Sequence, residues 1–245
     1  MAGTTVAPDQ STSPPTTIPV EPARRVLVLG DSGMVDAAPA VVAMFQATGA
    51  VALDGSRGGL GLTRLGFEAE TSPFAELWAG MVAAEEPDLI VVMLGVWDGG
   101  WVEANGPSAY APVVEEAVRI LTSQGARVLW LSTPPEPTID DRPVDHVFAQ
   151  VAANHPGQVF YADIDAAVRT PDGTVAPAYR SSDGTTVQLR KADGWHFCPD
   201  GAAAVATEIE RLVVELGLTV SAGTSWVDGG WRAARVYDGY PECRN

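Results

Sequence analysis

Six consecutive apolar residues, Leu89-Ile90-Val91-Val92-Met93-Leu94, constrain the fold of this chain more than any other segment. The run lies between Asp88 and Gly95 and shows no polar alternation. Such a run is typical of a strand buried on both faces, which occurs mainly in parallel sheets covered by helices. We therefore expect a parallel sheet at the centre of the fold.

Shorter apolar runs alternate with helical patterns along the rest of the chain. We predict further strands at residues 26–29, 51–53, 127–131 and 159–161, and helices at residues 35–47, 73–84, 107–123, 144–153 and 199–216. This alternation indicates an α/β domain, here a three-layer α/β/α sandwich with a mainly parallel, flavodoxin-like central sheet. Residues 1–22, rich in Pro, Thr and Ser, are predicted to be a linker, and residues 23–245 one domain with an aromatic C-terminal tail.

Gly30-Asp31-Ser32 directly follows the first predicted strand. Ser32 therefore lies at the carboxyl end of a strand, where open α/β sheets bind their ligands. A serine between a strand and a helix can act as a nucleophile, and its backbone N–H lies where a helix N-terminus stabilises a developing oxyanion. Alternatively, Ser32 only caps that helix. The two roles are compatible.

Asp193-Gly194-Trp195-His196 lies about 160 residues further along the chain. His196 is one of three histidines, and we interpret it as the general base for Ser32. Asp193 would hold the imidazole ring in the right tautomer. The simpler interpretations are a surface or capping role for His196 and a turn role for Asp193 before Gly194. Asp200 is interpreted as part of the opening turn of the last helix.

Together the two blocks resemble those of the SGNH hydrolases, also called the GDSL family, over residues 24–217. That family carries its nucleophile in an N-terminal Gly-Asp-Ser block and its acid and base in a C-terminal Asp-x-x-His block. The resemblance implies an SGNH hydrolase-like fold with a Ser32–His196–Asp193 triad. More narrowly, residues 193–201 resemble the soluble domain appended to membrane acyltransferases that acylate cell-envelope sugars.

The resemblance also implies three oxyanion donors: the Ser32 backbone N–H, a glycine N–H and an asparagine side chain. Gly58 and Gly59 are the glycine candidates, although an ordinary flexible loop is the alternative there. The asparagine position holds Trp97, whose indole N–H is a bulkier donor and a departure from the family pattern. Losing one donor costs roughly 100-fold to 1,000-fold in turnover. We therefore expect slow hydrolysis unless another group compensates, which would suit an acyltransferase.

Trp97, Asp98 and Trp101 are the candidate substrate-binding residues. They follow the strongest predicted strand and so should lie at the carboxyl edge of the sheet. Tryptophan rings at the rim of a site suit stacking on a sugar ring. Packing in the protein core is the alternative for both tryptophans.

Composition and patterning argue against nucleic-acid partners, membrane-spanning segments and metal sites. The formal net charge is −16, whereas nucleic-acid binding needs clustered Lys and Arg, so no nucleic-acid partner is expected. The chain has no run of 18 apolar residues, so we expect no transmembrane segment in it. No signal peptide is visible at the start. His146 and His155 lie in an unrelated stretch, and no metal or cofactor is predicted.

Cys198 and Cys243 are the two cysteines, and they lack the spacing of zinc or redox motifs. The residues alone allow either two buried thiols or one bridge that joins the aromatic tail to the His196 loop. The resemblance to envelope-facing domains favours the disulfide, which forms in oxidising compartments. We therefore expect an extracytoplasmic location, secreted or facing the cell envelope, with another segment delivering the domain.

The predicted function is that of a serine esterase or O-acyltransferase that forms a covalent acyl-enzyme at Ser32. The resemblance suggests O-acylated cell-envelope carbohydrate as substrate and a membrane-embedded acyltransferase domain as partner. One alternative is a non-catalytic SGNH-like domain for carbohydrate binding or docking, which Trp97 favours. A generic lipase or thioesterase is the other.

Overall fold

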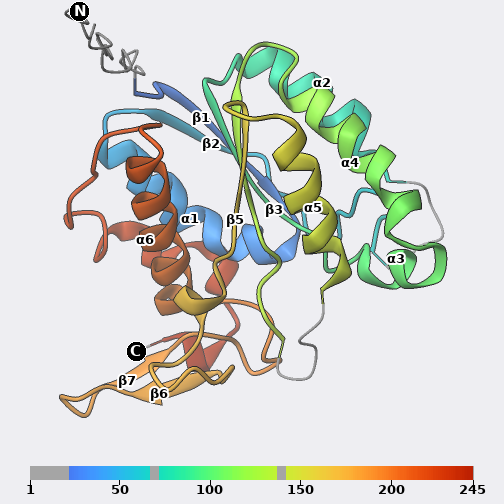
Figure 1. Cartoon of the computed structure of the whole chain (residues 1–245). Coiled ribbons are helices and arrows are strands. Elements are labelled where there is room, and N and C mark those ends of the chain that lie inside the picture. Colours follow the sequence, from blue (N-terminus) through green and yellow to red (C-terminus); the bar gives the residue numbers. More distant parts are fainter. Residues whose placement is uncertain (1–21, 67–71, 137–141, 245) are drawn as a thin grey trace, which may run out of the picture.

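Five parallel strands form the central sheet of the computed structural model, which describes residues 22–66, 72–136 and 142–244 (Figure 1). Residues 1–21, most of the predicted linker, lie outside the described residues. The strand order is β2-β1-β3-β4-β5, the order of flavodoxin-like sheets, so the predicted parallel sheet is confirmed. The strands are β1 (Arg25–Gly30), β2 (Val51–Asp54), β3 (Leu89–Met93), β4 (Arg127–Leu131) and β5 (Val159–Ala162).

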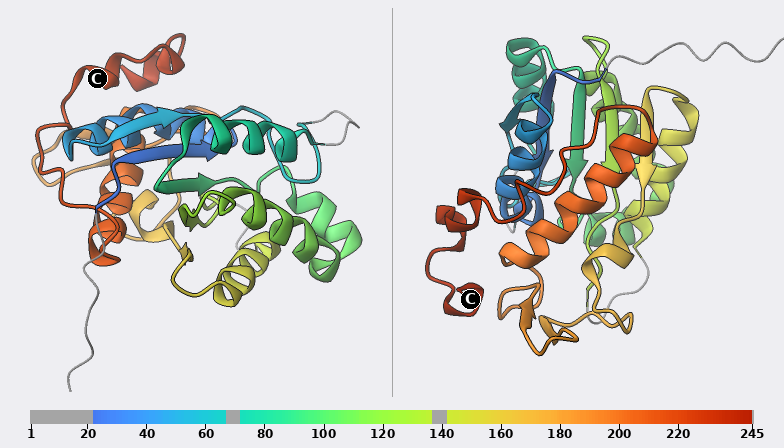
Figure 2. Two further views of the ribbon diagram at one scale, coloured as in Figure 1. Left: turned by 90° about the horizontal axis from the view of Figure 1, so that it is seen from above. Right: turned by 90° about the vertical axis from the view of Figure 1, so that its left-hand side faces the viewer.

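Helices cover both faces of the sheet, as Figures 1 and 2 show. On one face, α1 (Ser32–Ala47) packs against α6 (Pro199–Glu215). The other face carries α2 (Phe74–Glu85), α4 (Pro107–Leu121) and α5 (Pro143–Asn154), with the short α3 (Gly99–Asn105) beside the last two. The three-layer α/β/α prediction is therefore confirmed.

Side-chain alternation along the strands divides the core into two halves. Val26 and Val28 of β1 belong to the half beneath α1 and α6, whereas Leu27 and Leu29 belong to the opposite half. The buried residues of β3 divide in the same way, because successive strand side chains point to opposite faces. Each such side chain contributes roughly 1.5–3 kcal/mol on burial, so a one-residue slip of a central strand is strongly disfavoured.

Several short elements lie outside the sequence predictions. They are helix α3, the antiparallel hairpin of β6 (Ala178–Arg180) and β7 (Thr186–Gln188), and the 3-10 helices η1 (Asp165–Val168), η2 (Gly230–Ala233), η3 (Arg235–Tyr237) and η4 (Pro241–Cys243). Segments of three to seven residues are too short to show a clear periodicity, so the sequence pattern could not reveal these elements.

The C-terminal tail packs onto the domain. Trp226 and Tyr237 are about 95% buried in the same half of the core as α1 and α6. Just before the tail begins, Leu218 O accepts a hydrogen bond from Ala23 N–H at 2.9 Å. None of the helices in the described residues has the length and apolar character needed to span a bilayer.

Candidate active site

A pocket of about 560 Å³ lies at the carboxyl ends of β1, β3 and β4. The segments that line it are residues 31–33 after β1, residues 96, 97 and 100 after β3, residues 134–136 after β4, and residues 64, 190, 195 and 196. The chain leaves β1 and β3 in opposite directions across the sheet, which makes this place the topological switch point. Ser32 and His196, distant in sequence, line this one pocket.

Ser32 is the first residue of α1, so the helix begins three residues earlier than the sequence pattern indicated. Asp31 is the N-cap, because its Oδ1 accepts from Gly33 N–H at 2.9 Å. The capping role considered for Ser32 therefore belongs to Asp31. A Cβ at Gly30 would lie 2.1 Å from Met93 O, so only glycine fits at the turn that presents the serine.

Asp31 also joins two strand ends beneath the pocket. Its Oδ2 accepts from Gly95 N–H at 3.3 Å, and its side chain is almost fully buried. Burial raises the pKa of Asp31 to about 7, although the hydrogen bonds from Gly33 and Gly95 act in the opposite direction. The residue directly before Ser32 is thus a buried carboxyl group with a pKa near neutral pH.

Asp193 and His196 form a hydrogen-bonded pair on the loop before α6. His196 Nδ1 lies 2.7 Å from Asp193 Oδ2, and Asp193 Oδ1 accepts from the N–H groups of Trp195 at 2.8 Å and His196 at 3.0 Å. Partial burial would raise the pKa of Asp193, but these hydrogen bonds outweigh it and lower the pKa. The carboxylate therefore stays ionised and favours the tautomer with a proton on Nδ1, which leaves Nε2 to accept one.

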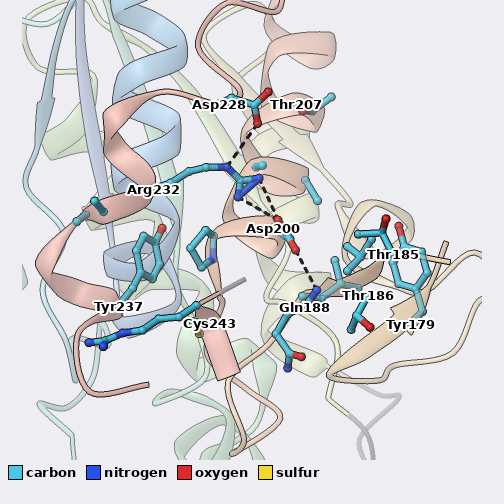
Figure 3. A pocket seen from close by; sticks show the side chains of 18 of the residues that line it. Tyr179, Thr185, Thr186, Gln188, Asp200, Thr207, Asp228, Arg232, Tyr237 and Cys243 are labelled. Carbon is cyan, nitrogen blue, oxygen red and sulfur yellow. Dashed lines mark hydrogen bonds and ion pairs between the residues drawn. The ribbon is translucent and has the colours of Figure 1, made fainter. Parts of the chain in front are cut away.

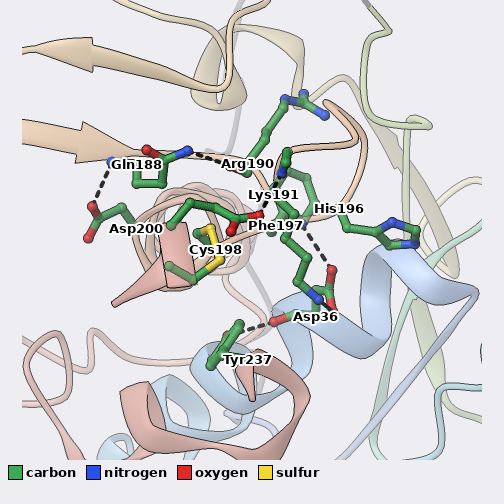
Figure 4. Close-up of a disulfide and its surroundings, with 12 residues drawn as sticks. Asp36, Gln188, Arg190, Lys191, His196, Phe197, Cys198, Asp200 and Tyr237 are labelled. Atoms are coloured by element: carbon green, nitrogen blue, oxygen red, sulfur yellow. Dashed lines mark hydrogen bonds and ion pairs between the residues drawn. A yellow bond between two sulfur atoms is a disulfide. The ribbon is translucent and has the colours of Figure 1, made fainter. Parts of the chain in front are cut away.

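The His196 loop is attached to the helix that carries Ser32. Asp36 of α1 accepts from Lys191 Nζ at 2.9 Å and from Phe197 N–H at 3.0 Å, one residue from each end of the loop. The hydroxyl of Tyr237 donates to Asp36 O at 2.7 Å and brings in the tail. Figure 4 shows Asp36 at the centre of these contacts.

Cys198 and Cys243 form a disulfide, as predicted, with their Cα atoms 5.0 Å apart (Figure 4). Cys198 directly precedes α6, and Cys243 lies near the end of the tail. Around the bridge, Lys191 Nζ lies 3.9 Å from the centre of the Tyr240 ring, and Ala192 N–H donates to Glu242 at 2.8 Å. The tail therefore braces the loop of the candidate general base.

Of the three residues proposed to bind substrate, only Trp97 lines the pocket. Asp98 lies outside the pocket lining, and its buried carboxylate accepts from Leu62 N–H, Thr63 N–H and the Tyr110 hydroxyl at 2.8–2.9 Å. Asp98 therefore holds residues 62 and 63 against α4. Trp101 packs against Tyr110, with ring centroids 6.1 Å apart, and is also absent from the pocket lining.

Gly58 and Gly59 lie on the loop that follows β2 and are not among the residues that line the pocket. Gly59 has a φ of +80°, which requires glycine, and its carbonyl accepts from Gly66 N–H at 2.6 Å. Their assignment as oxyanion donors stays a prediction. The glycines that do line the pocket are Gly33 and Gly100.

Three charged residues of the pocket escaped the sequence analysis: Arg64, Glu136 and Arg190. Lys191, the single lysine of the sequence, also went unnoticed although it lies two residues before Asp193. A basic pair in so acidic a chain, directly before the Asp-x-x-His block, was a usable signal. Arg64 and Glu136 lie in stretches with no motif, so only packing brings them to the site.

A larger cavity, of about 920 Å³, lies between the β6–β7 hairpin, the start of α6 and the tail (Figure 3). Its wall includes the ion pair of Asp200 and Arg232 at 2.9 Å, and Asp200 also accepts from Gln188 N–H at 2.9 Å. Asp200 thus has the structural role expected of it at the opening of α6. Neither Ser32 nor His196 lines this cavity, so the smaller pocket is the candidate active site. The described residues contain no His, Cys, Asp and Glu cluster suited to a metal ion.

The family model described as "Protein of unknown function (DUF459)" matches residues 25–212, and the chain belongs to that family. No curated protein matches the sequence.

Solved structures with a similar fold include TesA and two proteins named as esterases. TesA is 19% identical, with a TM-score of 0.55 over 78% of this chain and 99% of its own. The aryl esterase of M. smegmatis is 18% identical, with a TM-score of 0.54 over 79% of this chain and 100% of its own. A family 3 carbohydrate esterase of Clostridium thermocellum is 11% identical, with a TM-score of 0.51 over 79% and 96%. These similarities establish an SGNH hydrolase-like α/β fold.

Proposed function

We propose that the protein is a serine ester hydrolase or O-acyltransferase that acts through Ser32, His196 and Asp193. The observation that carries the proposal is the 2.7 Å contact between His196 Nδ1 and Asp193 Oδ2, in a pocket that Ser32 also lines. A nucleophile, a base and an orienting carboxylate are the three parts that covalent acyl transfer needs. The proteins of similar fold that are named as esterases support the same reaction class.

In this reaction Ser32 Oγ attacks the ester carbonyl while His196 Nε2 accepts the hydroxyl proton. Asp193 keeps the ring oriented and stabilises the imidazolium that forms. The N-terminus of α1 supports the oxyanion, with the Ser32 N–H as the first donor and Gly58, Gly59 and Trp97 as proposed further donors. His196 then protonates the leaving alcohol, and water or a sugar hydroxyl attacks the acyl-enzyme by the reverse sequence.

We further propose an O-acylated cell-envelope carbohydrate as the substrate, outside the cytoplasm. Support comes from Trp97 and Trp195, which line the pocket, and from Trp195 being about 40% exposed, as a ring that stacks on sugar would be. Carbohydrate esterases of similar fold agree with this substrate class. The disulfide supports an oxidising location. A membrane-embedded acyltransferase domain is the proposed partner.

A fluorophosphonate probe tests the nucleophile directly. The wild-type protein should be labelled, and peptide mass spectrometry should place the label on Ser32. Ser32→Ala should lose both labelling and turnover of 4-nitrophenyl acetate, with an unchanged thermal midpoint. A label on another residue, or full turnover by Ser32→Ala, would show that the triad is wrong.

The second candidate function is a non-catalytic carbohydrate-binding or docking domain, which the tryptophan at position 97 favours. In that case neither the probe nor the aryl ester should react, while oligosaccharides of the cell envelope should still bind. Isothermal titration calorimetry on the Ser32→Ala protein measures such binding without interference from turnover.

A further inference from the structure

Three charged side chains that line the candidate active site keep a buried polar atom without a hydrogen-bond partner in the described residues. They are Arg64 at Nε, Glu136 at Oε2 and Arg190 at both Nε and Nη2. Buried polar groups are normally paired, and an unpaired one in a cavity is commonly satisfied by a ligand or solvent. Because several such atoms belong to residues of one pocket, we expect polar groups of the substrate to form the missing hydrogen bonds.

Arg190 is the most rigidly held of the three. Its Nη1 donates to Trp195 O at 3.0 Å, and its guanidinium lies 5.2 Å from the centre of the Phe197 ring. The residue is about 99% buried. One edge of the guanidinium is thus fixed on the His196 loop, whereas Nε and Nη2 have no hydrogen-bond partner among the described residues.

The same edge of arginine binds carboxylates elsewhere in this protein. Arg119 donates from Nε and Nη2 to the two oxygens of Glu116 at 2.8 and 2.6 Å. Arg211 contacts Glu208 through the same two atoms at 3.0 and 2.5 Å. A planar group with two acceptor oxygens fits the fork of a guanidinium, and a carboxylate is that group.

The charges in the pocket agree with an anionic ligand. Burial lowers the pKa of Arg190 to about 10, so the guanidinium remains protonated at neutral pH. Arg64 adds a second positive charge, and the acidic residues of the lining are Glu136 and Asp31. Burial raises the pKa of both carboxyl groups, that of Asp31 to about 7. No ion pair joins Glu136 to Arg190 among the residues that the structure describes. The pocket therefore brings two arginines together in a chain with a net charge of −16.

We propose that Arg190, assisted by Arg64, forms a carboxylate subsite beside Ser32, so that the substrates are esters that also carry an acidic group. This proposal rests on the proposed function of Ser32. The Nε–Nη2 edge of Arg190 takes the two carboxylate oxygens, and Arg64 adds a further donor. Glu136 Oε2 can accept a hydrogen bond from a hydroxyl of the same substrate. An acylated acidic sugar satisfies all of these groups.

Two aryl esters that share the same leaving group but differ in charge test the carboxylate subsite. Mono-4-nitrophenyl succinate carries a carboxylate in its acyl part, and methyl 4-nitrophenyl succinate is its neutral counterpart. The wild-type protein should prefer the anionic ester in kcat/KM by about tenfold to 100-fold, the range for a hydrogen bond to a charged group. Arg190→Gln and Arg64→Gln should each bring this ratio towards one, and Arg119→Gln, remote from the pocket, should leave it unchanged.

The ratio of kcat/KM between the anionic and the neutral ester distinguishes two roles of Arg190: recognition of a carboxylate and support of the His196 loop. Because Arg190 also holds Trp195, its substitution can slow the hydrolysis of both esters. A purely structural role would lower the two rates equally and keep the ratio, which would overturn the proposal. Arg64→Gln provides a second variant that leaves the contacts of the His196 loop intact.

A second pair of substrates locates the acidic group. In 4-acetoxybenzoate the carboxylate belongs to the leaving alcohol, and methyl 4-acetoxybenzoate is the neutral counterpart. A preference confined to this pair would assign the subsite to the alcohol part of the ester, and one confined to the succinates would assign it to the acyl part. Equal rates within both pairs would overturn the subsite even if Ser32 is active.

Binding to Ser32→Ala distinguishes failure of the subsite from failure of the proposed function. Isothermal titration calorimetry should detect monomethyl succinate but not dimethyl succinate, and Ser32→Ala/Arg190→Gln should lose that binding. Selective binding without any wild-type turnover would support the carboxylate subsite and contradict the proposed enzymatic activity. Turnover with neither selective binding nor a preference for the anionic ester would contradict the carboxylate subsite and support the proposed enzymatic activity.

Discussion

Lys191 Nζ lies 2.9 Å from Asp36 Oδ1, and both side chains are at least 96% buried. Asp36 lies one helical turn after Ser32 on α1, whereas Lys191 begins the segment that carries Asp193 and His196. The ion pair thus connects two parts of the candidate active site that are 155 residues apart. One buried contact thus helps to position both Ser32 and His196, the proposed nucleophile and base.

Lys191→Met should destabilise the fold by about 3–5 kcal/mol, because it leaves the Asp36 carboxylate buried without its cation. Urea unfolding measures the loss, and Asp36→Asn/Lys191→Met should recover part of it by removing the unpaired charge. Arg119→Met, which breaks an exposed pair, is the matched control and should change stability little. A loss below about 1 kcal/mol for Lys191→Met would contradict a supporting role for the buried pair.

Asp193→Asn should lower ester turnover by roughly 100-fold to 10,000-fold, because an amide no longer selects the required imidazole tautomer. The lowered pKa of Asp193 means that the wild-type carboxylate should remain ionised at pH 5 and above. Steady-state kinetics with an aryl ester checks the effect, and circular dichroism checks that the fold persists. Wild-type turnover in Asp193→Asn would remove this residue from the triad.

Asp31→Asn should change how stability depends on pH. The folded protein holds the Asp31 proton up to about pH 7, whereas the unfolded chain releases it near 3.8. Between these values the folded state binds more protons, so the wild type loses stability as pH rises, by at most about 1.4 kcal/mol per unit. The variant lacks this loss, and its stability relative to wild type should increase from pH 4 to pH 7. Parallel urea curves at several pH values that show a constant difference would contradict the raised pKa of Asp31.

Removing the disulfide with Cys198→Ala/Cys243→Ala should cost about 4 kcal/mol in the chain-entropy model, since the bridge spans 45 residues. Turnover should also fall, because the tail braces Lys191 and Ala192. Urea unfolding and aryl-ester kinetics measure the two effects. Non-reducing peptide mapping of protein made in an oxidising compartment should find the linked peptides, and two free thiols there would refute the bridge.

Trp97→Asn distinguishes catalysis from recognition. In a working transferase with weak hydrolysis, asparagine should restore a donor and raise aryl-ester turnover. A gain of about tenfold corresponds to roughly 1.4 kcal/mol of transition-state stabilisation. If Trp97 instead stacks on sugar, oligosaccharide affinity should fall and turnover should stay at background. An unchanged result in both assays would leave Trp97 as a packing residue of the pocket wall.

Much of the fold was predictable from local sequence. The strand at residues 127–131 was placed correctly, and the boundaries of the helices beginning at Phe74, Pro143 and Pro199 agree within a residue or two. Apolar runs and helix-start residues act over a few neighbours, so they can be read without knowing the tertiary contacts. The disulfide was also anticipated, but through the family resemblance rather than through local pattern.

Contacts between distant segments were decided only in the tertiary structure. The sequence by itself determined the strand–helix alternation and the Gly-Asp-Ser and Asp-x-x-His blocks, because each depends on neighbouring residues. It left open that Asp98 anchors a loop, that Asp36 pairs with Lys191 and that Arg64, Glu136 and Arg190 meet in one pocket. A charged residue becomes a structural anchor or a ligand contact according to what packs against it, and burial sets its pKa and its need for a partner.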